Sequence, residues 1–471
     1  MGDRRRTRRV ETIAEALAAR PGKTIPELFL GRYDVQAAYD LFDRPEATPE
    51  AIQAGHRRIA LARLRSPGYY LLIEDTTFLS FSHRRRPVTG LGPIGGSEDG
   101  QQGFLLHSVL AVAAPWPLAD AASRDRPAVE LVGLADQQYL VRKDRPAGEP
   151  KHASTRRKLR ARESRRWLDA GRRIGPAPAD GGVRRVRVAD READIYEYLM
   201  LCMDLGHGFV VRVMQDRIVL DPGTGRRGGL TTDWAAATEA GGGVALELRG
   251  RDGHPARRAK LLVSFGAIRL QAPERPGQPA GAGEPIDCWF VRAWEVGAPE
   301  GVEPLEWLLY HDRPVGDLAA ALGVLRDYSI RPLIEEFHKG LKTGMGAERL
   351  QLEEAGRLFA ATALMSVVAL RLLDLRELGR LCPGAPAGRS GLDALELAVL
   401  EAESVRRLET VCDVLLAIGR LGGHMNRKAD GMPGWLTLWR GMDRLRTLVQ
   451  GARLMQRIGG ATGHTTGPTK A

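Results

Sequence analysis

The chain is poor in the features that mark disulfide-stabilised, membrane-spanning and nucleotide-driven proteins. Four cysteines occur among 471 residues, and no two of them form a Cys-x-x-Cys pair. A disulfide framework or zinc site is therefore not expected, and a reducing cytosol fits. Met1 leads almost directly into arginines, so no signal peptide is predicted. The longest apolar stretch, 358–375, is interrupted by Arg371 and predicts a buried helix and no membrane contact. No Walker-type sequence occurs, which argues against a nucleotide cofactor.

Positive charge, by contrast, is abundant and unevenly distributed. The formal net charge is +11 and the pI is about 9.7. Arginines crowd the N-terminus, and a second basic run extends over 151–173. Each Lys or Arg that meets a phosphate strengthens binding to nucleic acid in a salt-dependent, sequence-blind way. We expect a polyanionic partner, although a solvated arginine-rich face would give the same composition.

Hydrophobic periodicity divides the chain into segments of different type. Residues 10–65 are helix-patterned, and Thr48-Pro49-Glu50 resembles a helix start with proline in the first turn. Strand-like runs occur at 69–73, 105–112, 129–134, 183–188 and 209–212. The pattern predicts an α/β core with a mixed sheet. The predicted parts are a helical N-terminal module (1–65), an α/β domain (66–345) with a β-rich insertion (213–305), a helical C-terminal domain (346–458) and a loose tail (459–471).

Three isolated carboxylates follow or lie within these patterned segments. Asp75 and Asp190 each end an apolar, strand-like run, and Glu335 lies in a helix-like segment rich in Arg, His and Lys. Mg²⁺ prefers hard oxygen ligands, and two ions about 4 Å apart can activate a water and stabilise the leaving oxygen of a phosphodiester. The three residues are therefore candidate catalytic metal ligands.

Each of these carboxylates also has a structural alternative. Asp75 could cap a turn at the end of its strand. Asp194 and Glu192 compete with Asp190 for a place at the site, and Glu335 could form ion pairs within its own helix.

The same residues carry a resemblance to a known family. The string Tyr328-x-x-Arg331-x-x-x-Glu335-x-x-x-x-x-x-Lys342 resembles the signature of the insertion-sequence-four family of bacterial transposases. The strings 73–77 and 190–194 resemble that family's two aspartate motifs, and the likeness runs nearly end to end. It implies a ribonuclease-H-like core in which Asp75, Asp190 and Glu335 form a DDE triad holding two Mg²⁺ ions, with Mn²⁺ as a substitute. It also implies a homodimer, formed through the C-terminal helices, that acts in the bacterial cytoplasm near the nucleoid.

The resemblance further implies a set of DNA contacts. Residues 5–9, Arg-Arg-Thr-Arg-Arg, match the family's Arg-Arg-Thr-x-Arg, and Trp307 matches a tryptophan that stacks on an extruded base. A packed core tryptophan and a strand-terminal surface arginine are the alternatives for Trp307 and Arg212. Pro332 and Leu333 depart from the aromatic and basic residues expected there. The implied contacts are Arg5, Arg6, Arg9, Arg212, Trp307, Tyr328, Arg331 and Lys342.

The expected function is that of a cut-and-paste transposase, an endonuclease and strand-transfer enzyme of DNA transposition and recombination. Its partners would be double-stranded transposon ends and target DNA. The chain starts past the point where the family's first helix ends, so the N-terminal DNA-binding module is expected to be shortened. A truncated, non-catalytic inhibitor of transposition is therefore an alternative, and a plain metal-dependent nuclease is another.

Overall fold

A computed structural model describes residues 2–82, 87–94, 101–114, 128–143, 163–179, 181–248, 257–274, 283–427 and 430–462. The chain divides into two compact units that do not follow its order. The helical unit comprises Met1–Gly55, Leu79–Phe104 and Glu336–Ala471. The sheet unit comprises His56–Phe78 and Leu105–Glu335. The second basic run, up to residue 162, lies outside the described residues, as do residues 275–282 of the predicted insertion.

The sheet unit is built on a mixed sheet. Its order is β2-β3-β1-β5-β6-β12-β11-β10-β7-β8, with β4 also on β3 and β9 also on β10. β2 and the ends of β1 and β3 belong to the helical unit. The first strands are β1 (Gly68–Ser80), β2 (Gly92–Pro93), β3 (Gln102–Ala114), β4 (Glu130–Leu140), β5 (Val183–Ala189) and β6 (Gly208–Arg212). β1 and β6 both run parallel to β5, and β12 (Glu306–His311) runs antiparallel to β6. This order confirms the predicted mixed α/β fold and is consistent with a ribonuclease-H-like core.

The segment 213–305 extends the same sheet with antiparallel strands. It holds β7 (Ile218–Leu220), β8 (Arg227–Leu230), α8 (Thr231–Ala237), β9 (Gly242–Leu248), β10 (Arg257–Leu270) and β11 (Ile286–Val296). β11 pairs with β10 along one edge and with β12 along the other, so the inserted strands continue the sheet beyond β12.

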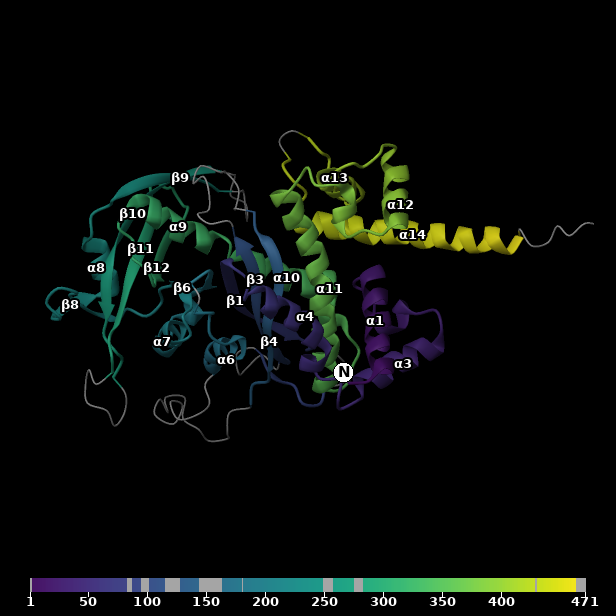
Figure 1. The fold of residues 1–471 in the computed structure, drawn as a ribbon, viewed down its shortest axis with the longest axis horizontal. Coiled ribbons are helices and arrows are strands. Elements are labelled where there is room, and N and C mark those ends of the chain that lie inside the picture. The colour runs from purple at the N-terminus through teal and green to yellow at the C-terminus, as the bar shows by residue number, and fades with distance from the viewer. Residues whose placement is uncertain are drawn as a thin grey trace, which may run out of the picture. The chain divides into compact units, whose positions relative to one another are not determined.

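Helices cover both faces of the sheet unit. α6 (Arg165–Ile174) packs on β4 and on α7 (Tyr196–Asp204), and α7 in turn packs on β6 (Figure 1). α9 (Leu318–Ser329) packs against β5, β6, β10 and β11. Alternate residues of a strand face opposite sides of a sheet. In β1, Tyr70 and Leu72 accordingly pack with Ala170 of α6, whereas Tyr69 bonds Asp327 of α9.

The helical unit holds the two ends of the chain. Its helices are α1 (Arg4–Ala19), α2 (Ile25–Leu28), α3 (Arg32–Phe42), α11 (Ala355–Leu381), α12 (Ala394–Ser404), α13 (Val411–Leu421) and α14 (Trp435–Thr462). α12 and α13 pack on α14 (Figure 1). Within the described part of the chain, α11 alone is long and apolar enough to cross a membrane, and 72% of its apolar window is buried. The predicted buried helix is thus confirmed.

One predicted helix boundary agrees with the structure, and two others differ from it. α4 (Pro49–Arg63) begins at the predicted proline. α1, however, begins at Arg4 and not near residue 10, because the Asp3 carboxylate accepts a hydrogen bond from the Arg5 amide at 2.7 Å and caps the helix. The C-terminal helix continues past the predicted boundary at residue 459, to Thr462.

The helix that carries Glu335 also differs from expectation. α10 (Pro332–Lys339) ends before Lys342 and continues as a π-helix, Gly340–Gly344. Regular α-helical spacing therefore does not extend from Glu335 to Lys342. Glycine at this bend has a packing reason, since a Cβ on Gly340 would lie 2.2 Å from the Trp435 ring of α14.

Candidate active site

The sheet unit brings Asp75 and Asp190 to neighbouring positions. β1 and β5 are adjacent parallel strands, and Glu74 of β1 is paired with Ala189 of β5. Asp75 and Asp190 are the next residues of the two strands, so they lie at the same edge of the sheet. The patterned runs that predicted these strands thus also explain why the two carboxylates meet.

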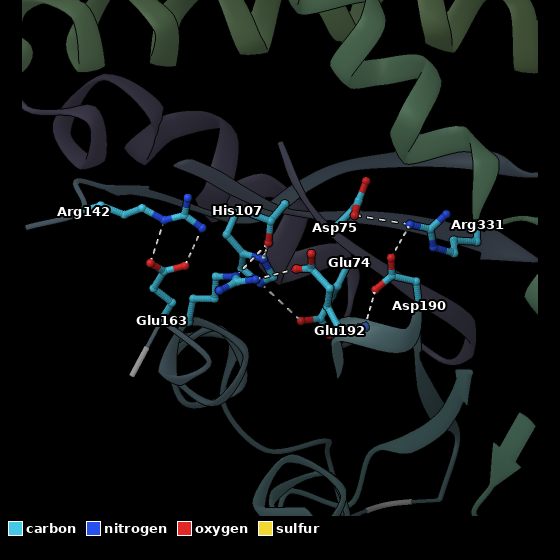
Figure 2. A network of polar contacts seen from close by, with 10 residues as sticks. Glu74, Asp75, His107, Arg142, Glu163, Asp190, Glu192 and Arg331 are labelled. Atoms are coloured by element: carbon cyan, nitrogen blue, oxygen red, sulfur yellow. Dashed lines mark hydrogen bonds and ion pairs between the residues drawn. The ribbon is translucent and has the colours of Figure 1, made fainter. Parts of the chain in front are cut away.

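A single guanidinium gathers all three predicted carboxylates. Arg331 Nη2 donates to Asp75 Oδ1 at 3.3 Å and to Asp190 Oδ2 at 3.0 Å, and Arg331 Nη1 donates to Glu335. Figure 2 shows Arg331 beside Asp75 and Asp190. The Arg331 side chain is 13% exposed, and that of Glu335 is 49% exposed. Three residues that lie far apart in sequence therefore converge on one positive centre within one compact unit.

The electrostatics of this cluster favour a cation at its centre. Burial disfavours the charged form of Arg331, but Asp75, Asp190 and Glu335 outweigh it and raise the pKa of the guanidinium. Within the described residues, no three His, Cys, Asp or Glu side chains are spaced to hold one metal ion directly. At this cluster the guanidinium takes the central position. The donor set, three carboxylates directed at one positive charge, is of the type that hard divalent cations prefer.

Asp194, one of the two rivals of Asp190, has a structural role. Its side chain is buried and pairs with Arg217 at 2.6 Å. It also accepts hydrogen bonds from the amides of Met214 and Gln215 at 2.7 and 2.6 Å. Fully engaged in fixing the start of the inserted segment, it is not available to the carboxylate cluster.

Glu192, the other rival, lies in a 3₁₀ turn after β5, where its amide donates to Asp190 Oδ1 at 2.9 Å. It therefore supports Asp190 through its backbone.

Besides Arg331, three predicted DNA contacts lie in the same unit as the carboxylates. Trp307 is partly exposed on β12, and its ring meets Tyr328 edge-on at 5.6 Å. Arg212 lies opposite Leu309 in the sheet register, and its guanidinium donates to the Glu306 carbonyl at 2.8 Å. Burial raises the pKa of Tyr328, while Arg331 and Arg212 oppose that rise. An aromatic pair with two guanidinium groups thus lies near the carboxylates.

The other predicted DNA contacts belong to the helical unit. Lys342 lies 3.6 Å from Glu348. Arg5 is exposed on α1, but Arg6 pairs with Glu46 at 3.1 Å and Arg9 with Asp34 at 3.2 Å. Of the three N-terminal arginines, Arg5 alone points to solvent without such a pair in the described structure. His338 of α10 is buried.

Sequence reasoning missed a buried polar network directly behind the two aspartates. Glu74 and Arg187 are both fully buried and form an ion pair between β1 and β5. The Tyr198 hydroxyl donates to the same Glu74 oxygen at 2.7 Å, and His107 Nε2 lies 3.6 Å from the other one. The available signal was the presence of charged residues at inward positions of apolar strands, which demands a partner.

Two family models match the ends of the chain. A model described as transposase DNA-binding matches residues 1–47, which include α1 to α3. A model described as the transposase Tn5 dimerisation domain matches residues 367–463, which run from within α11 to the end of α14. The chain therefore carries DNA-binding and dimerisation regions of this type, as expected. The alternative of a non-catalytic inhibitor is not favoured by these matches. Together they support a transposase of the Tn5 type.

Proposed function

We propose that this protein is a cut-and-paste DNA transposase of the insertion-sequence-four family and that Asp75, Asp190 and Glu335 form its DDE triad. The observation that carries the proposal is the convergence of these three carboxylates on Arg331. The family matches at both ends add DNA binding and dimerisation. A transposase needs all three properties in one chain.

The triad would hold two Mg²⁺ ions, or Mn²⁺ in their place. When bound, they would supply activation of the attacking oxygen and charge stabilisation at the leaving oxygen. The remaining work falls to side chains of the chain itself. Arg331, released from the carboxylates, can bind a phosphate beside the scissile bond. Trp307, half-buried on β12, offers aromatic surface on which an extruded base can stack.

The reaction begins with attack of water on one strand at the element's end. The P–O bond to the 3′ oxygen breaks, and that oxygen takes up a proton to leave a 3′ hydroxyl. The hydroxyl then attacks a phosphodiester of the opposite strand and forms a hairpin, as the family resemblance implies. The P–O bond to the flanking DNA breaks, and the flanking DNA leaves with a protonated 3′ hydroxyl. A second hydrolysis reopens the hairpin, and the freed 3′ hydroxyl joins target DNA. Each strand-transfer step exchanges one phosphodiester for another, so no nucleotide need be consumed.

The test uses the full chain with Mg²⁺ and a labelled DNA carrying the inverted repeat that flanks its gene. We expect a hairpin product and, with target DNA, joined product. Plain nicking would instead make the protein a nuclease, and a mobility shift without cutting would make it a regulator. Asp75→Asn should abolish cleavage and keep DNA binding. Asp204→Asn, which changes an exposed aspartate of α7, is the matched control and should cleave like the wild type. Cutting by the Asp75 variant would refute its role as a ligand.

A further inference from the structure

Arg166 ties together the two chain segments that carry Asp75 and Asp190. Its Nε donates to the Thr76 hydroxyl at 2.8 Å, and its Nη2 donates to Glu192 Oε2 at 2.6 Å. Thr76 directly follows Asp75 on β1, and Glu192 lies in the turn after Asp190. One planar side chain from α6 thus spans both strand ends from the face of the sheet opposite Arg331.

The bridge is held rigidly at its own base. The Arg166 side chain is 8% exposed, and its backbone carbonyl accepts a hydrogen bond from Gln138 of β4 at 2.9 Å. His107 Nδ1 lies 3.0 Å from the same Thr76 hydroxyl, so the hydroxyl is fixed from a second side. The next residue, Trp167, is fully buried and packs edge-on against His107 at 4.6 Å. These contacts determine where the guanidinium points.

The effect of the bridge reaches Asp190 through the backbone. The Glu192 amide donates to Asp190 Oδ1 at 2.9 Å (Figure 2). When Arg166 fixes the Glu192 side chain, it also fixes the turn whose amide orients the aspartate. Groups that hold metal-binding carboxylates in place commonly change metal affinity or activity 10- to 100-fold when removed.

We propose that Arg166 is a positioning residue for the DDE triad, acting on Asp190 through Glu192 and on Asp75 through Thr76. The inference rests on the proposed function, because it assigns a role within the same reaction. Arg166 contacts none of the three carboxylates in the described structure.

The fold should survive the loss of the Arg166 guanidinium, which separates a positioning role from a merely structural one. The Glu192 side chain is 56% exposed, and ion pairs with an exposed partner contribute little to global stability. Arg166 and Glu192 also line an open cavity of about 210 Å³. Water can therefore fill the space that a shorter side chain leaves, and the variant should fold.

The experiment compares Arg166→Gln, Arg166→Lys and Glu192→Gln with Arg165→Gln, which removes the exposed arginine next along α6. Four quantities are measured on the full chain: the single-turnover cleavage rate in Mg²⁺, the Kd for the DNA end in EDTA, Mn²⁺ binding to the protein–DNA complex by electron paramagnetic resonance, and Tm. Arg166→Gln should cut about 10- to 100-fold more slowly and bind Mn²⁺ more weakly, with the Kd for DNA and Tm unchanged. Arg166→Lys should recover only part of the rate, because a lysine lacks the planar fork that reaches both partners.

The Glu192 variant keeps the inference testable if an Arg166 variant fails to fold. Glu192→Gln should show the same slowing, and the double variant with Arg166→Gln should be no slower than either single one. Wild-type rates for Arg166→Gln would overturn the positioning role alone, as would equal slowing by Arg165→Gln. A wild-type protein that binds the DNA end without cutting it would overturn the proposed function, and the positioning role with it.

Discussion

The buried pair of Glu74 and Arg187 should be the most strongly coupled pair of charges in the sheet unit. Both side chains are 0% exposed and join β1 to β5 just behind the candidate aspartates. The Arg187 guanidinium also lies 5.1 Å from the centre of the Tyr198 ring. Removing one partner of such a pair leaves an uncompensated buried charge, which costs about 3–5 kcal/mol.

The titration of Glu74 gives a second estimate of the same size. Burial opposes its ionisation, but Arg187 and His107 together outweigh burial and hold the pKa of Glu74 at about 2, below the ordinary 4.5. A difference of roughly 2.5 pKa units corresponds to about 3 kcal/mol. Because the folded pKa is lowered, this stabilisation is fully present above about pH 4.5. It is lost as the pH falls towards 2.

We therefore expect Glu74→Gln and Arg187→Met each to lower the free energy of unfolding by about 3–5 kcal/mol. The double variant should lose far less than the sum, leaving a coupling energy of about 2–4 kcal/mol, since neither charge is then left alone. The assay is urea denaturation of the full chain followed by circular dichroism, with hydrogen exchange of the β1 and β5 amides as the local readout.

A surface pair in the same unit provides the matched control. Arg142 and Glu163 form a two-bond ion pair at 2.7 and 2.9 Å (Figure 2), but their side chains are 28% and 48% exposed. Its coupling energy should fall below about 1 kcal/mol. Strictly additive losses of unfolding free energy for Glu74→Gln and Arg187→Met would refute the reasoning. Equal coupling energies for the buried pair and the surface pair would refute it as well.

Two further perturbations test the charges around the site. Arg331→Gln should raise the affinity for Mn²⁺ in the absence of DNA by about tenfold, or ~1.4 kcal/mol, because the three carboxylates lose their internal counter-ion. Arg313→Gln, which changes an exposed arginine, is the control. Weaker Mn²⁺ binding by the Arg331 variant in an electron paramagnetic resonance titration would contradict the prediction. Asp327 is 3% exposed and burial raises its pKa from 3.8 to about 7, so wild-type stability should fall by about 4 kcal/mol as the pH rises from 4 to 7. Asp327→Asn should remove that slope, and parallel urea-midpoint curves for the two proteins between pH 4 and 8 would argue against it.

The sheet at the candidate site could be predicted because its signal is local. Runs such as 69–73 and 183–188 carry apolar residues at consecutive or alternate positions, and a carboxylate ends each run. Period and composition suffice to identify such strands. The adjacency of β1 and β5 is a property of the pairing between strands more than a hundred residues apart in the chain. It entered the prediction only through the resemblance to a family.

Partner choice among charged residues could not be read from the sequence. Arg187 lies in the run Val-Arg-Arg-Val-Arg-Val, where three arginines look equivalent. In the structure, Arg184 pairs with Asp312, Arg185 donates to backbone carbonyls, and Arg187 is buried against Glu74. Gly171 of α6 makes room for the last of these, because a Cβ there would lie 2.5 Å from the Arg187 guanidinium. The packing of the helices onto the sheet decides which partner each arginine finds, and that information is not local.

A basic composition is therefore a weaker guide to the DNA surface than the count of arginines suggests. Arg331, Arg6 and Arg9 were all predicted to meet phosphates, yet each pairs with a carboxylate of its own unit. A phosphate must displace these carboxylates, so part of the attraction is offset by the lost pair. At Arg331 that exchange has a second consequence, because the carboxylates it would leave are the candidate metal ligands. DNA that draws Arg331 away would expose a triad of negative charge at the scissile bond, which would couple substrate binding to metal binding.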